Sequence, residues 1–516
     1  MEDVASILFS MRVKGIKIWT DKGKLYYDAP RRTLTPSDVA NLRTLKREII
    51  NFLQRSRFSA STEEPLVPRD PSERVPLAIC QLFFWNIFSQ NSGQSRRPPT
   101  LIKRLSGHLD IKALERALTE LTRRHEILRT NIVTEQGAPT QKIREPSEIK
   151  LERIHVTGAS AAEREDNARR LIKRLAEQII DVAIDPLFKP GLLILGEEDQ
   201  IFFVLMDHII FDGPSVQILD RDITTLFSQA AHQRQFSLPA MPIQFADYAV
   251  WQQRTRASRV DVHDAFWKAR LAGARHVRVF SDGGARTNPS KLVRHMVRFE
   301  PSLTITLRRL SVARRTTLML SLLTMYVALL SRWCNRADLV VSVPTVTRRH
   351  PEVENTIGPL GVSLFLRVGI FEDDSFIDLL RRVADEYNSA YEHDDSGKLA
   401  AKAPPPEFVS NACFSFFSKN YRTLSVPSWS DAARFGNSLE DVPFELNLEL
   451  DGIDYGHTEP ILVVIERQDD MVGFLEYRSN LATLSTVERF VEHLQLFAWR
   501  LAEEPGGKLP RVAYGC

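Results

Sequence analysis

The sequence predicts a mixed α/β protein, in which a small helix–hairpin–helix domain at residues 1–56 precedes a larger body of two lobes. Two observations carry this prediction. From Val75 onward, short apolar runs of strand type alternate with long amphipathic helices, which is the pattern of an α/β fold. This body of about 440 residues exceeds the span of one hydrophobic core. We therefore expect an N-terminal lobe at residues 74–265 and a C-terminal lobe at residues 266–516.

The first domain is predicted from three short segments. Residues 4–13 are apolar at helical spacing, and residues 16–27 alternate apolar and polar side chains around an Asp-Lys-Gly turn, a hairpin signature. The Thr-Pro pair at 35–36 places an N-cap and a first-turn proline at the start of a second helix. Residues 57–73 are rich in Ser, Pro and charge, which is typical of a linker.

Charge separates the same two parts. The chain has 516 residues with 68 Lys or Arg and 65 Asp or Glu, a net charge of +3. This near balance argues against nucleic-acid binding over the whole surface. The first 58 residues carry twelve basic and six acidic side chains, a net of +6, so the remainder carries −3. We therefore expect the basic N-terminal domain to meet an acidic partner.

The body reads as strands and helices in alternation. We expect helices at 111–124 and 316–333, strands at 201–206 and 338–343, and a connection between the lobes at 278–291. The helical patterns repeat apolar residues every three to four positions, and the strands are continuous apolar runs of the kind found in buried sheets.

Composition bears on the compartment and on metal binding. The cysteines lie far apart and form no CxxC pair, so we expect no disulfide framework and no metal site. The N-terminus carries acids where a secretory signal needs positive charge. The longest apolar run, residues 318–330, is too short to span a membrane. These features predict a cytoplasmic protein without a membrane partner.

The strongest candidate for chemistry is the segment Asp207-His208-Ile209-Ile210-Phe211-Asp212-Gly213, between an apolar strand and a helical segment. His208 can act as a general base or orient an attacking amine or hydroxyl. Asp212 can pair with an arginine and hold the turn. Gly213 permits close backbone approach, and its N–H can bind an oxyanion. The spacing alone also fits an ordinary strand–turn–helix with a capping aspartate.

Further motifs occur in a fixed order along the chain. They are Pro76-Leu77-Ala78 with Gln81 and Trp85, Arg124-His125-Glu126-Ile127-Leu128-Arg129-Thr130, Asp185-Pro186-Leu187, Phe245-Ala246-Asp247-Tyr248-Ala249-Val250-Trp251, Ile357-Gly358 with Leu364, Leu366 and Arg367, and Asp441-Val442-Pro443-Phe444-Glu445. With the segment at 207–213, which matches HHxxxDG, this set resembles the condensation domains of nonribosomal peptide synthetases. The resemblance covers about residues 74–512.

The resemblance implies a fold and a reaction. The fold would be two chloramphenicol-acetyltransferase-like lobes in a V-shaped pseudo-dimer, crossed by a tunnel. A carrier protein would bring an acyl or peptidyl donor as a phosphopantetheine thioester, so the enzyme itself would bind no cofactor. His208 would deprotonate or orient an amine or hydroxyl acceptor, giving an amide or ester. Structural roles are implied for Arg124, His125, Arg129, Ser215 and Arg294, with Arg129 or Arg294 as the arginine that pairs with Asp212.

The chain departs from the family at Asp207, where the first histidine is usual and a structural role is usually described. Asp207, Asp212 and Ser215 also fit DxxxxDxxS, the pattern of heterocyclisation domains. The retained His208 and Gly213, with the RHEILRT and DVPFE segments, favour condensation. A recruitment module without chemistry and an acyltransferase using coenzyme A remain alternatives.

The N-terminal domain resembles the β-hairpin docking domains of such synthetases, of the TubC N-terminal type. These capture an acidic C-terminal segment of an upstream carrier protein by strand addition. The residues expected to contribute are Lys14, Lys17, Trp19, Lys22, Lys24 and Tyr26, the two aromatic residues mainly through packing. The chain ends at Cys516 without further synthetase domains. We therefore expect a stand-alone monomer that acts in trans on a carrier-bound chain, with a free or carrier-bound small-molecule acceptor and possible chain release.

Overall fold

The structure is a computed structural model that describes most of the chain. The described residues are 16–21, 24–28, 36–47, 49–50, 64–90, 94–257, 260–275, 277–282, 292–346, 348, 350–393, 412–418, 440–442, 460–467 and 470–510. The helix expected at 4–13 lies outside them.

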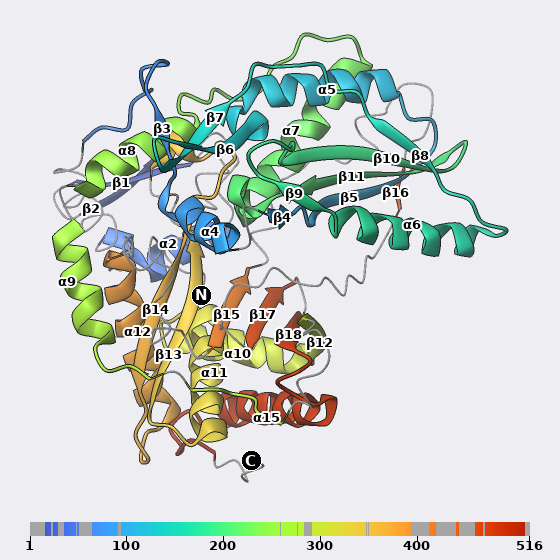
Figure 1. The fold of residues 1–516 in the computed structure, drawn as a ribbon. Coiled ribbons are helices and arrows are strands. Elements are labelled where there is room, and N and C mark those ends of the chain that lie inside the picture. The colour runs from blue at the N-terminus through green and yellow to red at the C-terminus, as the bar shows by residue number, and fades with distance from the viewer. Residues whose placement is uncertain are drawn as a thin grey trace.

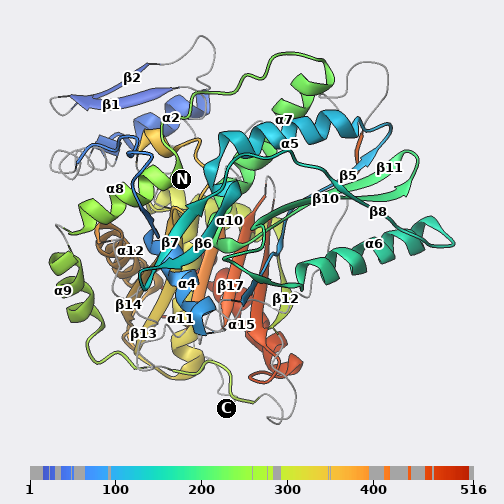
Figure 2. The ribbon, with the colours of Figure 1, turned by 45° about the horizontal axis from the view of Figure 1, so that its top comes forward.

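The predicted hairpin is present. Strands β1 (Lys17–Asp21) and β2 (Lys24–Asp28) pair antiparallel, with Asp21 opposite Lys24. Helix α2 (Pro36–Thr44) begins at the predicted proline. Figure 2 shows this small unit standing apart from the sheets of the two lobes.

The N-terminal lobe is built on a five-stranded sheet with the order β16-β5-β11-β10-β8. The bounds are β5 Pro99–Ser106, β8 Glu152–His155, β10 Phe188–Gly196, β11 Asp199–Met206 and β16 Glu440–Val442. Helices α5 (Ile111–Arg124) and α7 (Gly213–Ala231) cover one face and α6 (Ala161–Ala176) covers the other (Figure 1). Side chains along β11 alternate between these faces, so both are buried.

Shorter elements complete this lobe. They are β3 Val75–Pro76, α4 Ile79–Gln90, β4 Gln94–Arg96, η1 Glu126–Arg129, β6 Thr130–Glu135, β7 Ala138–Ile143, β9 Ile179–Asp181, η2 His208–Ile210 and α8 Phe245–Ala257. Helix α9 (Val260–Leu271) follows and packs Trp267 and Leu271 into the core of the C-terminal lobe. Strands β3, β7 and β6 form a second small sheet, and β4 pairs with β9.

The C-terminal lobe has a six-stranded sheet with the order β12-β18-β17-β15-β13-β14. Its strands are β12 Leu292–Phe299, β13 Asp338–Val346, β14 Gly361–Gly369, β15 Ala412–Phe417, β17 Ile461–Glu466 and β18 Met471–Arg478. Its helices are α10 Pro301–Ala313, α11 Leu318–Cys334, α12 Phe376–Glu392 and α15 Leu484–Glu503, with the short η3 at Pro351–Val353. Helix α11 is buried along nearly its whole length because it packs beneath the sheet.

The two lobes form the V-shaped pair expected from the sequence, each with its own hydrophobic core (Figure 1). The C-terminal part of the chain contributes two segments to the N-terminal lobe, strand β16 and an inserted segment at residues 353–360. Strand β16 comes from the C-terminal part of the chain but pairs with β5 of the N-terminal lobe. Val353, Ile357 and Leu360, just before β14, lie in the N-terminal core. The inserted segment contacts the N-terminus of α7, where the candidate site lies.

Within the described part of the chain, no single helix is long and apolar enough to cross a membrane. Helices α10 and α11, which are bent relative to each other, are together long and apolar enough, by length and composition alone.

Candidate active site

His208 sits where the central strand of the N-terminal sheet ends. Strand β11 is buried to its last residue, Met206, because helices cover both faces. The chain then makes one 3₁₀ turn, η2, before α7 begins at Gly213. This turn places the histidine at the end of the central strand, beside the segment that the C-terminal lobe contributes.

Asp207 fixes that turn. Its side chain is fully buried and accepts a hydrogen bond from the Ile209 N–H at 2.9 Å. Its own N–H donates to the Leu187 carbonyl at 3.0 Å. Burial raises the pKa of Asp207 to about 6, against the opposing effects of the Ser95 hydroxyl, the Ile209 N–H and the charge of Arg97.

Gln81 supports the same turn from α4. Its amide nitrogen donates to the Ile209 carbonyl at 3.1 Å, and its amide oxygen accepts from the Ala78 N–H at 3.0 Å. The opening PLA..Q segment of the sequence is therefore joined directly to the HIIFDG segment, which explains why its glutamine is buried.

Asp212 caps helix α7. Its Oδ1 accepts from the Ser215 N–H at 3.0 Å, and the Asp212 N–H donates to the Ser215 hydroxyl at 3.3 Å, which completes a capping box. The same hydroxyl donates to Asp212 Oδ1 at 2.5 Å. Asp212 Oδ2 accepts from the Leu360 N–H at 3.2 Å. The capping role that the spacing alone suggested is therefore present, and it is joined to the other lobe.

The arginine that pairs with Asp212 is Arg348, so the expectation of Arg129 or Arg294 was wrong. Arg348 Nη2 lies 2.9 Å from Asp212 Oδ1, and Nη1 donates to the carbonyls of Val353 and Thr356. This buried guanidinium holds the inserted segment and the helix cap with one side chain. Arg129 instead binds the carbonyls of Thr122 and Arg144, and Arg294 pairs with Glu476 on β18.

Gly358 lets the inserted segment approach closely. A Cβ at this position would lie 2.1 Å from the ring of Phe245. Its N–H donates to the Ser215 hydroxyl at 3.0 Å. The IG and FADYAVW segments of the sequence therefore meet at the same contact, next to the cap of α7.

The ring of His208 lies between two aromatic rings. The centroid of Phe84 is 5.8 Å away at 12° and that of Phe211 is 4.7 Å away at 20°. Burial lowers the pKa of His208 to about 4, since these surroundings disfavour the charged ring. At neutral pH the imidazole is uncharged and can accept a proton. The nearby Cys80 offers no competing nucleophile, because burial raises its pKa to about 12.

Gly213 is the first residue of α7 and Pro214 follows it. The first N–H groups of a helix have no partner within the helix, and proline has none to offer. The Gly213 N–H thus lies at the positive end of the helix dipole, five residues from His208.

The RHEILRT segment lies elsewhere, under α7. His125 Nε2 is 3.0 Å from Asp222 Oδ2, and the Arg124 Nε lies 3.5 Å from the same oxygen. Arg221 Nη2 is 2.7 Å from Asp222 Oδ1. Burial lowers the pKa of His125, partly offset by Asp222. This buried cluster anchors the middle of α7 to α5.

The candidate docking residues are only partly described. Lys24 is exposed, and Tyr26 is 40% exposed on β2. The packing role expected of Tyr26 stays a prediction. Lys14 and Lys22 lie outside the described residues, as do the side chains of Lys17 and Trp19.

Three residues of the site were missed as functional candidates: Arg348, Phe84 and Phe211. Arg348 is 136 positions from Asp212, and no local pattern joins them. Phe211 stands inside the HIIFDG motif and Phe84 inside the QLFFW segment. The aromatic residue in each motif was the sequence feature that could have indicated a role beside His208. Among the described residues, no group of three or more His, Cys, Asp or Glu side chains is placed to hold a metal ion.

This two-lobed fold, with a neutral histidine at the exchange between the lobes, defines an acyltransferase-like class. Residues 72–509 match the family model described as Condensation domain, and residues 4–55 match that of the TubC N-terminal docking domain. The chain belongs to the condensation-domain family of nonribosomal peptide synthetases and carries a docking domain at its N-terminus.

Known proteins agree with this assignment. Phosphinothricin tripeptide synthetase PhsC of Streptomyces viridochromogenes is 29% identical over 89% of this chain and 42% of its own length. The dimodular nonribosomal peptide synthase of Bacillus subtilis is 28% identical over 82% of this chain but 18% of its own length. This chain thus spans less than half the length of these curated relatives.

Solved structures share the fold. The X-domain from teicoplanin biosynthesis superposes with a TM-score of 0.73 at 22% identity, covering 88% of this chain and all of that one. The structure described as the molecular basis for condensation domain-mediated chain release from the enacyloxin polyketide synthase has a TM-score of 0.66 at 20% identity. It covers 100% of this chain and 98% of its own.

Proposed function

We propose that this protein transfers an acyl or peptidyl chain from the phosphopantetheine thioester of a carrier protein to an amine or hydroxyl acceptor. The observation that carries the proposal is the uncharged His208, held between Phe84 and Phe211 at the end of β11. The pantetheine arm belongs to the carrier and is part of the substrate.

The chemistry balances with one base. The acceptor nitrogen or oxygen attacks the thioester carbonyl carbon while His208 takes its proton. The C–S bond then breaks, and the protonated His208 returns the proton to the pantetheine sulfur. The Gly213 N–H at the start of α7 stabilises the carbonyl oxygen as it becomes negative. Asp207 and Asp212 act as positioning residues, because their oxygens are used by Ile209, Ser215 and Arg348.

Replacing His208 tests this role. We expect His208→Ala to lower product formation about 10²- to 10⁴-fold at saturating loaded carrier, the usual contribution of a general base. Intact-mass analysis of the carrier protein measures the loss of the acyl chain. The matched control is His232→Ala, at the opposite end of α7, whose ring binds the Ser228 carbonyl. An unchanged rate in His208→Ala would contradict the catalytic role of His208.

We further propose that residues 1–56 dock an acidic C-terminal segment of the carrier protein. This role is supported by the match of residues 4–55 to the docking family, the net charge of +6 over residues 1–58 and the exposed Lys24. In β1–β2 each strand pairs on one side only within the described residues, which leaves outer edges for strand addition.

Deleting residues 1–56 should raise the KM for the carrier by at least about tenfold and leave kcat at saturation within about threefold, since docking supplies binding rather than chemistry. Steady-state kinetics with a carrier that keeps its C-terminal tail measures both. Removing that tail should produce the same KM in the full-length enzyme. An unaltered KM after the deletion would contradict docking.

The acceptor is proposed to be a free small molecule, so that transfer releases the chain. The support is the enacyloxin structure, whose description names chain release and whose chain this one matches end to end. Offering the loaded carrier with panels of free amines and alcohols tests this. Products formed only with carrier-bound acceptors would contradict it.

Heterocyclisation is the second candidate. The cyclization-docking bidomain of EpoB from Sorangium cellulosum covers 99% of both chains with a TM-score of 0.64, and Asp207, Asp212 and Ser215 fit that pattern. Cysteine, serine and threonine acceptors distinguish the two, because cyclisation removes one additional water from the product mass. Condensation predicts the full mass of the open amide or ester.

A further inference from the structure

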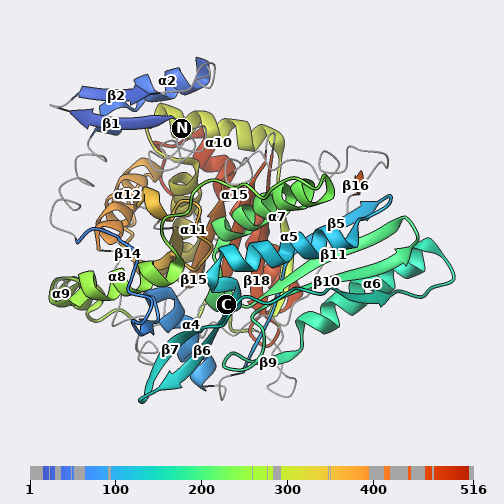
Figure 3. The same ribbon diagram turned by 90° about the horizontal axis from the view of Figure 1, so that it is seen from above.

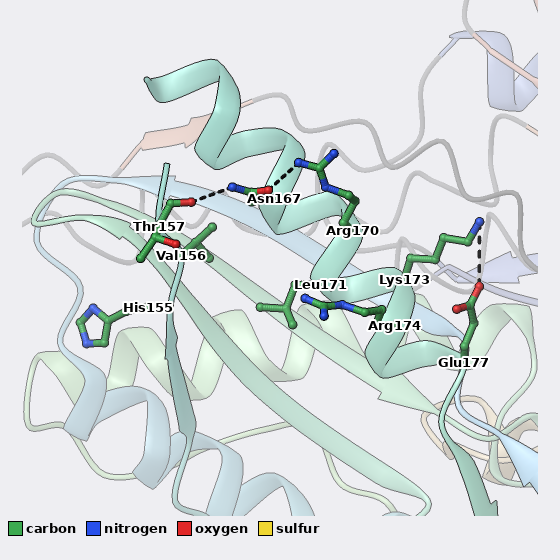
Figure 4. A pocket seen from close by; sticks show the side chains of 9 residues that line it. All are labelled: His155, Val156, Thr157, Asn167, Arg170, Leu171, Lys173, Arg174 and Glu177. Carbon is green, nitrogen blue, oxygen red and sulfur yellow. Dashed lines mark hydrogen bonds and ion pairs between the residues drawn. The ribbon is translucent and has the colours of Figure 1, made fainter. Parts of the chain in front are cut away.

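A basic cavity lies at the end of the N-terminal lobe opposite the hairpin β1–β2 (Figures 1 and 3). It has a volume of about 570 Å³ and opens between the end of β8 and one side of α6. Figure 4 shows His155 and Thr157 on the strand side, with Arg170 and Arg174 reaching from the helix. The cavity contains no residue of the His208 site and none of the docking hairpin.

The strand beside the cavity is an open sheet edge. β8 is the last strand of its sheet and, among the described strands, pairs with β10 alone, in parallel. The Val156 N–H donates to the Ile194 carbonyl at 2.9 Å. In a parallel ladder the main-chain groups alternate in direction, so Ile154 and Val156 face β10 while Arg153 and His155 face outward. Such an edge is a template for another strand.

One side chain marks where this edge meets α6. Asn167 Nδ2 donates to the Thr157 carbonyl at 2.7 Å. Thr157 follows the same alternation as Arg153 and His155, so its carbonyl points outward, and α6 reaches that side of the strand. A chain added along β8 would therefore run beside α6 and over the cavity.

The charge of the cavity is not balanced by its own acids. Within the described residues, no carboxylate pairs with Arg170 or Arg174; Arg170 binds the Asn167 amide oxygen at 2.5 Å. Lys173 is 3.9 Å from Glu177. The acids on the first half of α6 are used elsewhere: Glu165 by Arg104 and Arg169, and Asp166 by Arg169.

The helix dipole favours cations in the last turn of α6, which accounts for Arg174 on the helix. It accounts neither for the cavity nor for the open strand edge beside it. Both features select the same ligand shape, an extended chain with negative side chains.

We propose that β8 and α6 bind an acidic, extended segment of a partner protein, which adds to the sheet as a sixth strand. Side chains of an extended strand alternate between the two faces of a sheet. Every second residue of the segment would then face α6, where carboxylates would meet Arg170 and Arg174. The main chain would pair with the outward groups of Arg153 and His155. This contact is separate from the hairpin and would give the enzyme a second protein-binding surface.

The test uses the full-length protein and a capped peptide of about eight residues that alternates Glu and Thr, the length of an ordinary strand. Fluorescence anisotropy should show saturable binding. The charge reversal Arg170→Glu/Arg174→Glu should raise Kd at least about tenfold, because it replaces attraction by repulsion. The control Lys112→Glu/Arg314→Glu makes the same charge change at exposed positions on α5 and at the end of α10 and should leave Kd unchanged.

Two further peptides and one exchange measurement separate strand addition from simple charge attraction. A version with Lys in place of Glu, and one with a central Pro that cannot continue a ladder, should each bind at least about tenfold more weakly. Hydrogen exchange should slow at the Arg153 and His155 amides when the Glu-Thr peptide is bound. The proposal is overturned if the peptide fails to bind, if Arg170→Glu/Arg174→Glu binds it equally well, or if the Pro peptide or inorganic phosphate competes as effectively as the Glu-Thr peptide.

Discussion

The two motif histidines lie beside buried aspartates, yet their surroundings differ. His125 is hydrogen-bonded to Asp222, which also receives Arg124 and Arg221. His208 follows Asp207, but its ring stacks on Phe84 and Phe211, and Asp207 turns to the Ile209 N–H. One histidine belongs to a closed ionic cluster, and the other is packed between aromatic rings.

The pKa directions express this difference. Burial acts against the charge of both aspartates, but hydrogen bonds and cations lower the pKa of Asp222, whereas the pKa of Asp207 rises to about 6. A carboxylate with satisfied partners stabilises the fold, and one without enough partners costs stability when ionised. The carboxylate of Asp222 therefore stabilises the fold in the RHEILRT region. The carboxylate of Asp207, next to His208, costs stability when it is ionised.

Asp222→Asn should give the largest effect. It leaves His125, Arg124 and Arg221 without their shared carboxylate, and removing one partner of a buried ionic cluster costs about 3–5 kcal/mol. Because the folded pKa of Asp222 is lowered, this loss should be fully present above the unfolded value near 3.8 and fade as pH falls through the folded pKa. Urea unfolding at a series of pH values measures it.

Asp220→Asn is the matched control for this prediction. It lies two residues earlier on the same helix and pairs with Lys103 at 3.2 Å. An ion pair of this kind is worth about 1 kcal/mol or less. Equal effects of the two variants would remove the distinction between the His125 cluster and an ordinary ion pair.

The fold was largely predictable, because it depends on patterns within short segments. The hairpin, the bounds of α5 and the strand β11 follow from alternation and amphipathic spacing. The site was predictable only in its local part. His208 and the capping Asp212 stand within seven residues, but Arg348 approaches from the other lobe and replaces the two arginines that were expected. Which of many arginines reaches one carboxylate is decided by tertiary packing, and no periodicity in a single sequence encodes it.

Asp207→Asn should act in the opposite direction. The asparagine oxygen can still accept from the Ile209 N–H, while the cost of an ionised buried carboxylate disappears. A rise from 3.8 to about 6 corresponds to at most about 3 kcal/mol of stabilisation in the variant. The wild-type penalty is absent below pH 3.8, grows as pH rises, and is complete above about pH 6. The stability difference should follow that window.

Thermal unfolding of the variant and the wild type between about pH 3.5 and pH 8 measures this prediction, the range being set about the pKa values above. Asp185→Asn serves as the control, since this partly buried carboxyl accepts from the Asp181 N–H and also lies near Arg97. It should change stability by less than about 0.5 kcal/mol. A variant of Asp207 that is less stable than the wild type at neutral pH would show that Asp207 belongs with Asp222 as a stabilising carboxylate.

The smallest effect is expected from Phe84→Leu, which asks why His208 is uncharged. If the stacked rings exclude water from the imidazole, a smaller side chain admits water and the pKa of His208 moves from about 4 toward its ordinary value of 6.5. The acid limb of kcat/KM reports this group in the free enzyme, so it should move to higher pH while the rate at about pH 8 changes less than about threefold. Phe83→Leu is the control, since that ring contacts Phe84 edge to face and does not stack on His208. If the acid limb of kcat/KM moves in Phe84→Leu but not in Phe83→Leu, the stacked aromatic rings keep His208 uncharged. If the acid limb stays in place, burial as a whole lowers the pKa of His208, as it does for His125.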